Sequence, residues 1–402
     1  MTAKRLDRQA VTLSKAANEM VQEEIIKRVH HLSKSVVNAR FEEAGSLLVF
    51  EAPGDEGETL RERAAVIAKR VQQSLRSLTR TIVFRSAAAE TPTFLGDGNA
   101  RGVRFVGIGQ VALSGLPLAA FDYFDRVFTA MGDALGAVPL RVPTLIPVEI
   151  LAKCDYLKSF PHIVNFVSHL PEDSALIEDF QRRHQSLLAL DDAAAGQMAT
   201  PEAALSPAVC YHAYALHADD TIAAPGLTYG MCGKCFRYES SNMKDMRRLW
   251  DFTLREIVFL GSREEVLGQR ERGVQMMSEF LDAHEIAAEI RTASDPFFVA
   301  PDESLAKTYF QLSSDTKYEV AALLPDGSQL AVGSLNYHSD FFGKVFNCKA
   351  SNGGPMHSVC IGFGLERWVH ALLAQHGTDP ARWPRVMRDA PELARPSARV
   401  SG

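Results

Sequence analysis

The chain has 402 residues, of which 46% are apolar, and its formal net charge is −6. This length predicts two or three domains, and the apolar fraction is enough to fill a large core. The negative charge disfavours an extensive nucleic-acid-binding surface, because such surfaces need a basic excess.

No apolar run approaches the roughly 20 residues that a membrane-spanning helix needs, so we expect no membrane segment. The first residues, Met1–Ala10, are polar and do not resemble a signal peptide. In such a chain the six cysteines are interpreted as reduced thiols or metal ligands, not as disulfides. Together these features predict a cytoplasmic protein.

Residues 1–88 are predicted to form a small accessory α+β domain. Two segments, Ala17–Leu32 and Thr59–Leu78, have apolar residues at helical spacing. Two β-rich runs lie between them within Val36–Ala52, and a further strand is expected at Thr79–Phe84. We find no catalytic constellation in this part of the chain.

A polar stretch of small residues, Ser86–Arg101, is the predicted domain boundary. A larger domain is expected at 96–388, followed by a flexible tail at 389–402. The amphipathic segment Phe121–Leu135 and the proline-containing run Pro139–Pro147 predict a long helix followed by a strand. Proline is also common in ordinary edge strands, so this pair of elements is not specific.

The segment at about 186–207 is rich in Ala and Asp and contains two prolines and a glycine. It predicts an exposed insertion or mobile loop outside the core. The apolar run Leu205–Tyr211 comes next and contains Cys210. A single cysteine in such a run is more often a small core hydrophobe than a ligand.

The stretch Met231–Gly261 contains two predicted strands, Cys235–Glu239 and Leu249–Phe259, joined by a polar loop. Both strands carry charge where a simple hairpin would alternate apolar and polar residues. A guanidinium such as that of Arg237 stays charged and offers phosphate oxygens a planar fork of donors. The stretch therefore predicts an anion site. The alternative is a structural ion pair between Arg237 and Glu239 or a neighbouring carboxylate.

Cys232 and Cys235 form a C-x-x-C pair, which is typical of a redox pair or of half a zinc knuckle. The sequence has no second C-x-x-C to complete a four-thiolate site. The redox form normally opens a helix, whereas this pair runs into a predicted strand. Its role stays open, as do the roles of Cys154 and Cys348.

The segment Ile361–Arg367 reads G-x-G-x-E-R at the start of an apolar helix. Together with F-R-x-E at 236–239, it resembles motifs 3 and 2 of the class II aminoacyl-tRNA synthetases, and the elements at 121–147 are similar to motif 1. The resemblance implies an α+β fold with an antiparallel active-site sheet flanked by helices, and a homodimer. It also implies that Arg237 grips the α-phosphate of ATP and Arg367 the γ-phosphate.

Several segments together resemble the amino acid:carrier protein ligases, which are relatives of the atypical, methanogen-type seryl-tRNA synthetases. The resemblance covers about residues 100–388. It implies that ATP activates a small amino acid, of the glycine, alanine or serine type, as an aminoacyl-adenylate. The aminoacyl group would then pass to the phosphopantetheine thiol of a carrier protein. The matching segments lie at 206–211, 235–239, 254–258, 334–343 and 357–367.

The same resemblance implies a zinc site at Cys210, Glu256 and Cys360, which would hold the amino group of the amino acid. Three protein ligands with an open fourth position are typical of catalytic zinc. The match further implies ATP-binding roles for five residues. Arg248 would lie near the pyrophosphate, Phe252 and Glu239 would contact the adenine, and Gly364 and Asn336 are further ATP-binding residues. Phe252 is explained equally well as a core residue.

Magnesium is expected with ATP, and Asn336 is a candidate ligand. Seryl-type synthetases place a magnesium-binding glutamate just before the strand that matches 333–336, whereas this chain has Gln329–Val332 there. We assign no general base, because a thiol is already partly ionised near neutral pH. Histidines near the motifs are interpreted as structural or substrate-positioning: His212, His217 and His338.

The N-terminal 88 residues are a departure from the ligase family, and they keep a seryl-tRNA synthetase-like aminoacylation of tRNA as the alternative function. Acidic residues offset most of the basic ones in this segment, which disfavours tRNA. A regulatory or binding paralogue that has kept only the fold is a third hypothesis. Retention of both Arg237 and Arg367 argues against it.

Overall fold

The structure is a computed structural model, and it describes residues 5–33, 35–75, 80–185, 189–239, 243–294 and 315–394. The predicted tail at 389–402 lies mostly outside the described residues. In the part that is described, no helix is both long and apolar enough to cross a bilayer.

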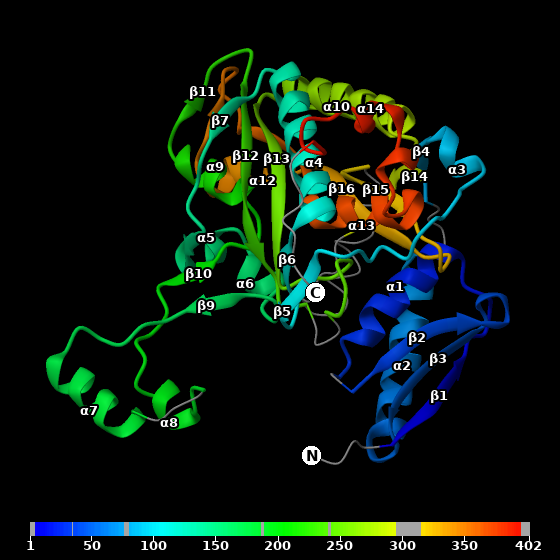
Figure 1. Cartoon of the computed structure of the whole chain (residues 1–402). Coiled ribbons are helices and arrows are strands. Elements are labelled where there is room, and N and C mark those ends of the chain that lie inside the picture. The colour runs from blue at the N-terminus through cyan, green and yellow to red at the C-terminus, as the bar shows by residue number, and fades with distance from the viewer. Residues whose placement is uncertain are drawn as a thin grey trace.

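A large, mainly antiparallel sheet forms the centre of the molecule (Figure 1). Its main path runs β4-β14-β15-β16-β18-β13-β12-β7. The last pair, β12 and β7, is parallel, and the hairpin of β5 and β6 joins the sheet through a contact with β13. The strands are β4 (Ile82–Arg85), β5 (Val103–Gly107), β6 (Gln110–Leu113), β7 (Val138–Leu140), β12 (Leu227–Phe236), β13 (Asp251–Gly261), β14 (Ala288–Thr292), β15 (Lys317–Leu323), β16 (Gln329–Tyr337) and β18 (His357–Gly364).

Three long helices, α4 (Gly115–Ala134), α10 (Arg263–Ala283) and α13 (Leu365–His376), pack against this sheet around the main core. The buried residues of α4 recur every three or four positions, as a helix with one apolar stripe requires. Phe128 of α4 stacks on Phe363 of β18, with 4.1 Å between the ring centroids. The expected helix at 121–135 is thus found, but it begins at Gly115.

One buried contact in this core makes the stability of the fold depend on pH. The Nε2 atom of His284 lies 2.8 Å from the Tyr123 hydroxyl, and its Nδ1 lies 2.8 Å from the Phe280 carbonyl. Burial lowers the pKa of His284 from its usual 6.5 to about 4, because the charged ring would lose its hydration.

We therefore expect the free energy of unfolding to fall as the pH drops from 6.5 to 4. In that interval the unfolded chain binds a proton at residue 284 and the folded chain does not. The loss is about 3 kcal/mol for a shift of this size. Denaturant unfolding of the wild type and of His284→Gln across this pH range measures it. The variant should show a shallower pH dependence, and identical slopes would contradict this assignment.

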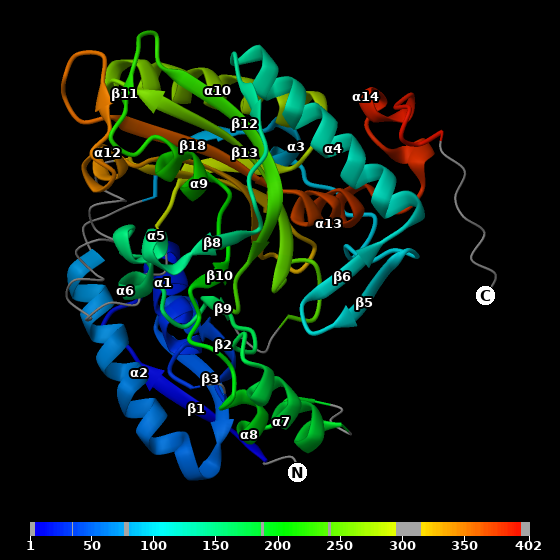
Figure 2. The same ribbon diagram turned by 90° about the vertical axis from the view of Figure 1, so that its left-hand side faces the viewer.

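The N-terminal residues form a separate three-stranded sheet, in the order β1-β3-β2, with a hydrophobic core of its own. Figures 1 and 2 show this unit below the central sheet. The strand β1 was not predicted, because its sequence, LDRQAVT, contains few apolar residues. In the structure, exposed and less exposed positions alternate along this strand. The elements are β1 (Leu6–Thr12), α1 (Glu19–His30), β2 (Val37–Glu42), β3 (Leu47–Pro53) and α2 (Gly54–Leu75).

The strand expected at Thr79–Phe84 is present as β4, but it does not belong to this N-terminal sheet. It pairs with β14 at the edge of the central sheet, so grouping it with the N-terminal unit was wrong. A four-residue run carries no information about its partner strand, and tertiary packing decides the pairing. The division of the chain into domains near residue 88 stays a prediction.

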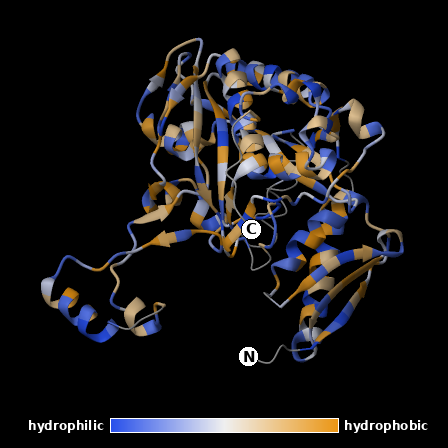
Figure 3. Cartoon of the chain, in the orientation of Figure 1, coloured by the Kyte–Doolittle hydropathy of each residue, from blue (hydrophilic) through white to orange (hydrophobic). Residues whose placement is uncertain are grey.

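A third, small sheet has the order β8-β10-β9, and α7 and α8 extend from it between β9 and β10. No residue of α7 is buried, and Figure 3 shows this helix as mostly hydrophilic. The segment at 186–207 was expected to be a loop outside the core. Part of it forms β10, in which Ala204 is fully buried. That part of the expectation was wrong, because two neighbouring strands stabilise a run too short to predict. The elements are β8 (Leu145–Pro147), β9 (Asn165–Val167), α7 (Ser174–His184), α8 (Asp192–Ala195) and β10 (Ala203–Leu205).

Short elements complete the described fold. They are α3 (Ala87–Glu90), α5 (Val148–Lys153), α6 (Tyr156–Ser159), α9 (Cys210–Leu216), β11 (Thr221–Ile222), α12 (Phe341–Val345), β17 (Lys349–Ala350) and α14 (Arg385–Arg388), with 3-10 turns at Glu43–Gly45 and Pro380–Arg382.

Candidate functional site

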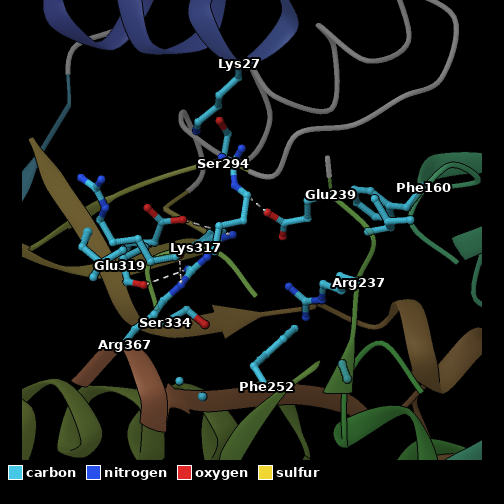
Figure 4. Close-up of a pocket in the computed structure, with 18 of the residues that line it drawn as sticks. Lys27, Phe160, Arg237, Glu239, Phe252, Ser294, Lys317, Glu319, Ser334 and Arg367 are labelled. Carbon is cyan, nitrogen blue, oxygen red and sulfur yellow. Dashed lines mark hydrogen bonds and ion pairs between the residues drawn. The ribbon is translucent and has the colours of Figure 1, made fainter. Parts of the chain in front are cut away.

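A cavity of about 2280 Å³ lies on the face of the central sheet opposite the main core (Figure 4). Successive residues of a strand point to opposite faces, so each strand contributes both to the core and to the cavity. In β13, Ile257 packs in the core while Glu256 lines the cavity, and in β18 the same holds for Ile361 and Cys360. This alternation explains why the strands carry charged residues.

Cys210, Glu256 and Cys360 meet at one end of this cavity. Cys210 begins α9, Glu256 lies on β13, and Cys360 lies on the adjacent strand β18. One sulfur or oxygen atom from each residue lies within 4.8 Å of the other two. The residues are 7%, 4% and 2% exposed. The structure therefore brings together the three residues that the sequence proposed as metal ligands.

The chemistry of this cluster fits a divalent cation. Burial raises the pKa of the Glu256 carboxyl, and a hydrogen bond with Cys210 together with burial raises that of the Cys360 thiol. The Oε2 atom of Glu256 is buried and has no hydrogen-bond partner. A cation would offset the free-energy cost of burying three anionic groups, and it would be coordinated by that oxygen. Two sulfurs and one carboxylate oxygen are a donor set that zinc accepts.

Arg237 follows β12 and reaches the cavity beside Phe252 (Figure 4). Its Nε atom donates to the carbonyl of Pro207 at 2.8 Å, and the guanidinium lies 5.4 Å from the centre of the Phe252 ring. Glu239 lies 3.4 Å from Arg248. The guanidinium of Arg237 is thus fixed by a backbone carbonyl and an aromatic ring, which leaves its fork of terminal nitrogens for an anion.

Arg367, in the first turn of α13, reaches the same cavity. Its Nε atom donates to the carbonyl of Arg247 at 2.9 Å, and Nη1 donates to the carbonyl of Ala331 at 3.0 Å. Burial lowers the pKa of this guanidinium, and a bound anion would counter that effect. The preceding residue, Glu366, has a structural role. Its carboxylate accepts hydrogen bonds from the backbone N–H and the hydroxyl of Thr253, which connects α13 to β13.

All ten site residues predicted from the sequence line this one cavity, although their roles stay predictions. Asn336 contributes a buried Oδ1 atom that has no hydrogen-bond partner. Of the three histidines, His338 lines the cavity, whereas His217 bonds to Asp220 and Tyr229. The ten residues are Cys210, Arg237, Glu239, Arg248, Phe252, Glu256, Asn336, Cys360, Gly364 and Arg367.

The C-x-x-C pair is not a redox pair in this structure. Cys235 is buried beside the cluster of Cys210 and Cys360, whereas Cys232 packs against the main core on the other side of the sheet. Residues three apart on one strand point to opposite faces, so the two sulfurs are separated by the sheet. Both cysteines are free.

Sequence reasoning missed Glu319 and the residues of α1 that line the cavity. Glu319 lies on β15 directly opposite Ser334 of β16, and both face the cavity. The expected carboxylate before 333–336 is absent, and Glu319 offers one from the neighbouring strand. The signal was a charged residue inside an apolar β-run, but only the strand register places it beside Ser334.

No protein-family model matches the chain. Amino acid–acyl-carrier-protein ligase 1 of Bradyrhizobium diazoefficiens is 31% identical over 287 residues, which cover 70% of this chain and 84% of that protein. The type-2 serine–tRNA ligase of Methanopyrus kandleri is 28% identical over 295 residues, which cover 70% of this chain and 56% of that protein.

Among solved structures, the seryl-tRNA synthetase of M. kandleri in complex with A. aeolicus tRNASec has a TM-score of 0.67 at 23% identity. The match covers 94% of this chain and 76% of that one. A likeness at this identity concerns the fold alone, and it confirms the predicted class II synthetase-like architecture.

Proposed function

The chain belongs to the amino acid–acyl-carrier-protein ligase family, and from that premise we propose that it activates a small amino acid with ATP and transfers it to the phosphopantetheine thiol of a carrier protein. One observation carries the proposal. Cys210, Glu256 and Cys360 converge in the cavity that also holds Arg237 and Arg367. This arrangement places a candidate amine-binding metal site beside two candidate phosphate-binding groups.

We propose Cys210, Glu256 and Cys360 as zinc ligands. When bound, zinc supplies a Lewis acid that takes the neutral α-amino group of the substrate. Phe342 lines the cavity, and its ring stacks on Tyr214 in the same apolar cluster as Cys210 and Cys360, with 3.9 Å between the ring centroids. We propose that this packing restricts the side chain that the site accepts, which favours glycine, alanine or serine.

In the first step, a carboxylate oxygen of the amino acid attacks the α-phosphorus of ATP. A P–O bond forms, the bond to the leaving oxygen breaks, and pyrophosphate departs. Arg237 orients the carboxylate and the α-phosphate, and Arg367 holds the γ-phosphate with Arg248 nearby. Oriented guanidinium groups lower the barrier by holding the two anions together and neutralising the charge that develops.

In the second step, the acceptor sulfur attacks the carbonyl carbon of the adenylate. The C–S bond forms, the C–O bond to AMP breaks, and the thiol proton goes to solvent. We assign no protein base to this step, because a thiol is a few per cent ionised at pH 7. For ATP itself, we propose that Phe252 stacks on adenine, that Glu239 contacts the base, and that Gly364 lies against the phosphates.

Magnesium is proposed to accompany ATP, with oxygen ligands from the strands β15 and β16. The Oδ1 atom of Asn336 is buried and without a partner, and Glu319 lies opposite Ser334 on the same face. Magnesium prefers such carboxylate, carbonyl and hydroxyl oxygens.

A homodimer in the cytoplasm is also proposed. Exposed apolar side chains lie at both ends of α4, the helix that matches motif 1: on the β5–β6 hairpin that precedes it and on β7 that follows it. Val106 is 74% exposed, Ile108 58% and Val138 53%. Val106 and Ile108 lie together on the hairpin, and exposed apolar side chains of this kind are often covered by a partner. We propose that a second copy of the chain covers them.

Carrier aminoacylation tests the proposed function. The purified protein is incubated with ATP, single amino acids and phosphopantetheinylated carriers, and the mass of each carrier is measured. We expect one or a few small amino acids to add their residue mass to a carrier. Transfer RNA serves as the second acceptor in a parallel assay. Charged tRNA with no loaded carrier would replace this proposal by the tRNA alternative.

A further inference from the structure

The N-terminal unit forms one wall of the cavity that contains the metal cluster. The helix α1 contributes a row of residues to the lining, spaced three or four apart along one helix face. Figure 4 shows Lys27 extending from α1 into the cavity toward Ser294. The lining residues of α1 are Glu19, Gln22, Glu23, Ile26, Lys27 and His30.

Opposite α1, the central sheet presents further cationic and hydroxyl groups. Arg291 lies on β14, and Lys317 lies at the start of β15. The backbone N–H of Ala293 donates to the carbonyl of Lys317 at 3.1 Å, which keeps Ser294 next to Lys317. Ser294 and Lys317 line the cavity and are 6% and 9% exposed.

One cation in this region has a hydrogen-bond donor to spare, although Glu319 lies opposite it in the strand register. Arg291 is 5% exposed, and its Nε atom is buried without a hydrogen-bond partner. Its distances to Glu23 and Glu289 are 3.7 and 4.0 Å. Both carboxylates have a nearer cation, because Arg80 binds Glu23 at 2.8 and 2.9 Å and a second arginine contacts Glu289.

Lys27 offers a second cation on the opposite wall of the cavity. Among the described residues, no carboxylate lies within ion-pair distance of its ammonium group, although Glu23 lies near enough to feel its charge. Lys317 lies 3.5 Å from Glu319 and keeps its ammonium group in the cavity lining. A buried guanidinium with an unused N–H, two ammonium groups and a buried hydroxyl together match the requirements of a phosphate group.

The position of these groups suggests which phosphate they bind. In the sheet register, Lys317 lies opposite Asn336, and Asn336 lies opposite Cys360. Lys317 is therefore two strand spacings, about 10 Å, from the metal cluster. The phosphate and thiol of phosphopantetheine are separated by an arm as long as about four extended residues, or about 15 Å. Such an arm can reach from this place to the adenylate carbonyl.

We propose that Lys27, Arg291, Ser294 and Lys317 bind the phosphate of the phosphopantetheine arm while its thiol enters the catalytic cavity. This inference rests on the proposed function and assigns the N-terminal unit a part in recognising the acceptor. The phosphopantetheine arm is narrow and carries a single phosphate, so it can enter a cavity in which a few cations bind that phosphate. RNA would need an extended basic surface, but the cations on the outer face of the N-terminal sheet are paired with acids, as Arg8 and Arg40 are with Glu42.

Two small acceptors that differ only in the phosphate test the proposal. Thioester formation is measured with free 4′-phosphopantetheine and with pantetheine, for the wild type and for Lys27→Ala. We expect the wild type to have a KM for phosphopantetheine about tenfold or more below that for pantetheine. Lys27→Ala should raise the KM for phosphopantetheine about tenfold, as loss of a charged hydrogen bond predicts. Its KM for pantetheine should not change.

Two controls separate phosphate binding from a structural effect. Lys69→Ala removes an exposed lysine from α2 of the same unit and should leave both KM values unchanged. Lys27→Arg should restore most of the preference for phosphopantetheine. Amino-acid-dependent pyrophosphate exchange should be the same in all variants, because the adenylate forms without the acceptor.

Several results would overturn the inference. Equal KM values for the two acceptors in the wild type, or an equal rise of both in Lys27→Ala, would exclude a phosphate site at Lys27 while leaving the proposed function intact. If Lys27→Ala impaired only tRNA charging, the site would bind an RNA phosphate. If the wild type exchanged pyrophosphate but loaded neither these thiols nor any phosphopantetheinylated carrier, the proposed function itself would fail.

Discussion

Arg237→Ala is expected to lower the kcat of amino-acid-dependent pyrophosphate exchange on the order of 10³-fold. Removing an oriented charged donor from a phosphoryl-transfer site costs about this much, because the charge it stabilises develops in the transition state. In the structure, the Nε atom of Arg237 is already bound to the carbonyl of Pro207. The terminal nitrogens are therefore available for substrate.

The matched variant Arg237→Lys keeps the charge but loses the planar fork, so it should recover only a small part of the activity. Thermal unfolding of both variants shows whether the fold is kept. A folded Arg237→Ala variant with more than a tenth of the wild-type kcat would contradict the role assigned to this residue.

Cys360→Ala is expected to remove the bound metal together with amino acid activation. The variant leaves only Cys210 and Glu256, which cannot hold zinc as three ligands do. We expect zinc content to fall from about one per chain to near zero, and exchange to fall by at least about 10³-fold, because the metal supplies the amine-binding group. Metal analysis by mass spectrometry and the exchange assay measure the two effects on the same sample.

Cys348→Ala is the matched control, because Cys348 is also a buried free cysteine but does not line the cavity. It should keep both zinc and activity. If Cys360→Ala kept its zinc and its exchange activity, the cluster would not be the amine-binding site. The loss of both in the control variant as well would point to a general loss of structure.

The candidate site could be predicted from the sequence because the family resemblance assigned it. The charge of Glu256 in an apolar strand favoured a ligand, whereas Cys360 alone was explained equally well as a core residue. Motif resemblance supplied the strand order that joins them, which spacing along the chain could not provide. The structure then brought Cys210 from α9 to the same point.

Other features depend on contacts that no local pattern records. The strand β4 lies next to the N-terminal unit in sequence but pairs with β14, and β10 is a three-residue run stabilised by its neighbours. The contribution of Lys27 to the cavity required the placement of α1 against the sheet, since its own segment shows only an ordinary amphipathic helix. Glu319 became a candidate ligand only through its register with Ser334.

X-ray absorption at the zinc edge of the purified wild-type protein tests the central claim most directly. We expect about two sulfur neighbours at about 2.3 Å and lighter oxygen or nitrogen neighbours at about 2.0 Å, and the light-atom contribution should change when a small amino acid is added. A zinc-free protein that still activates amino acids, or a site with four sulfur neighbours that ignores the amino acid, would contradict the account.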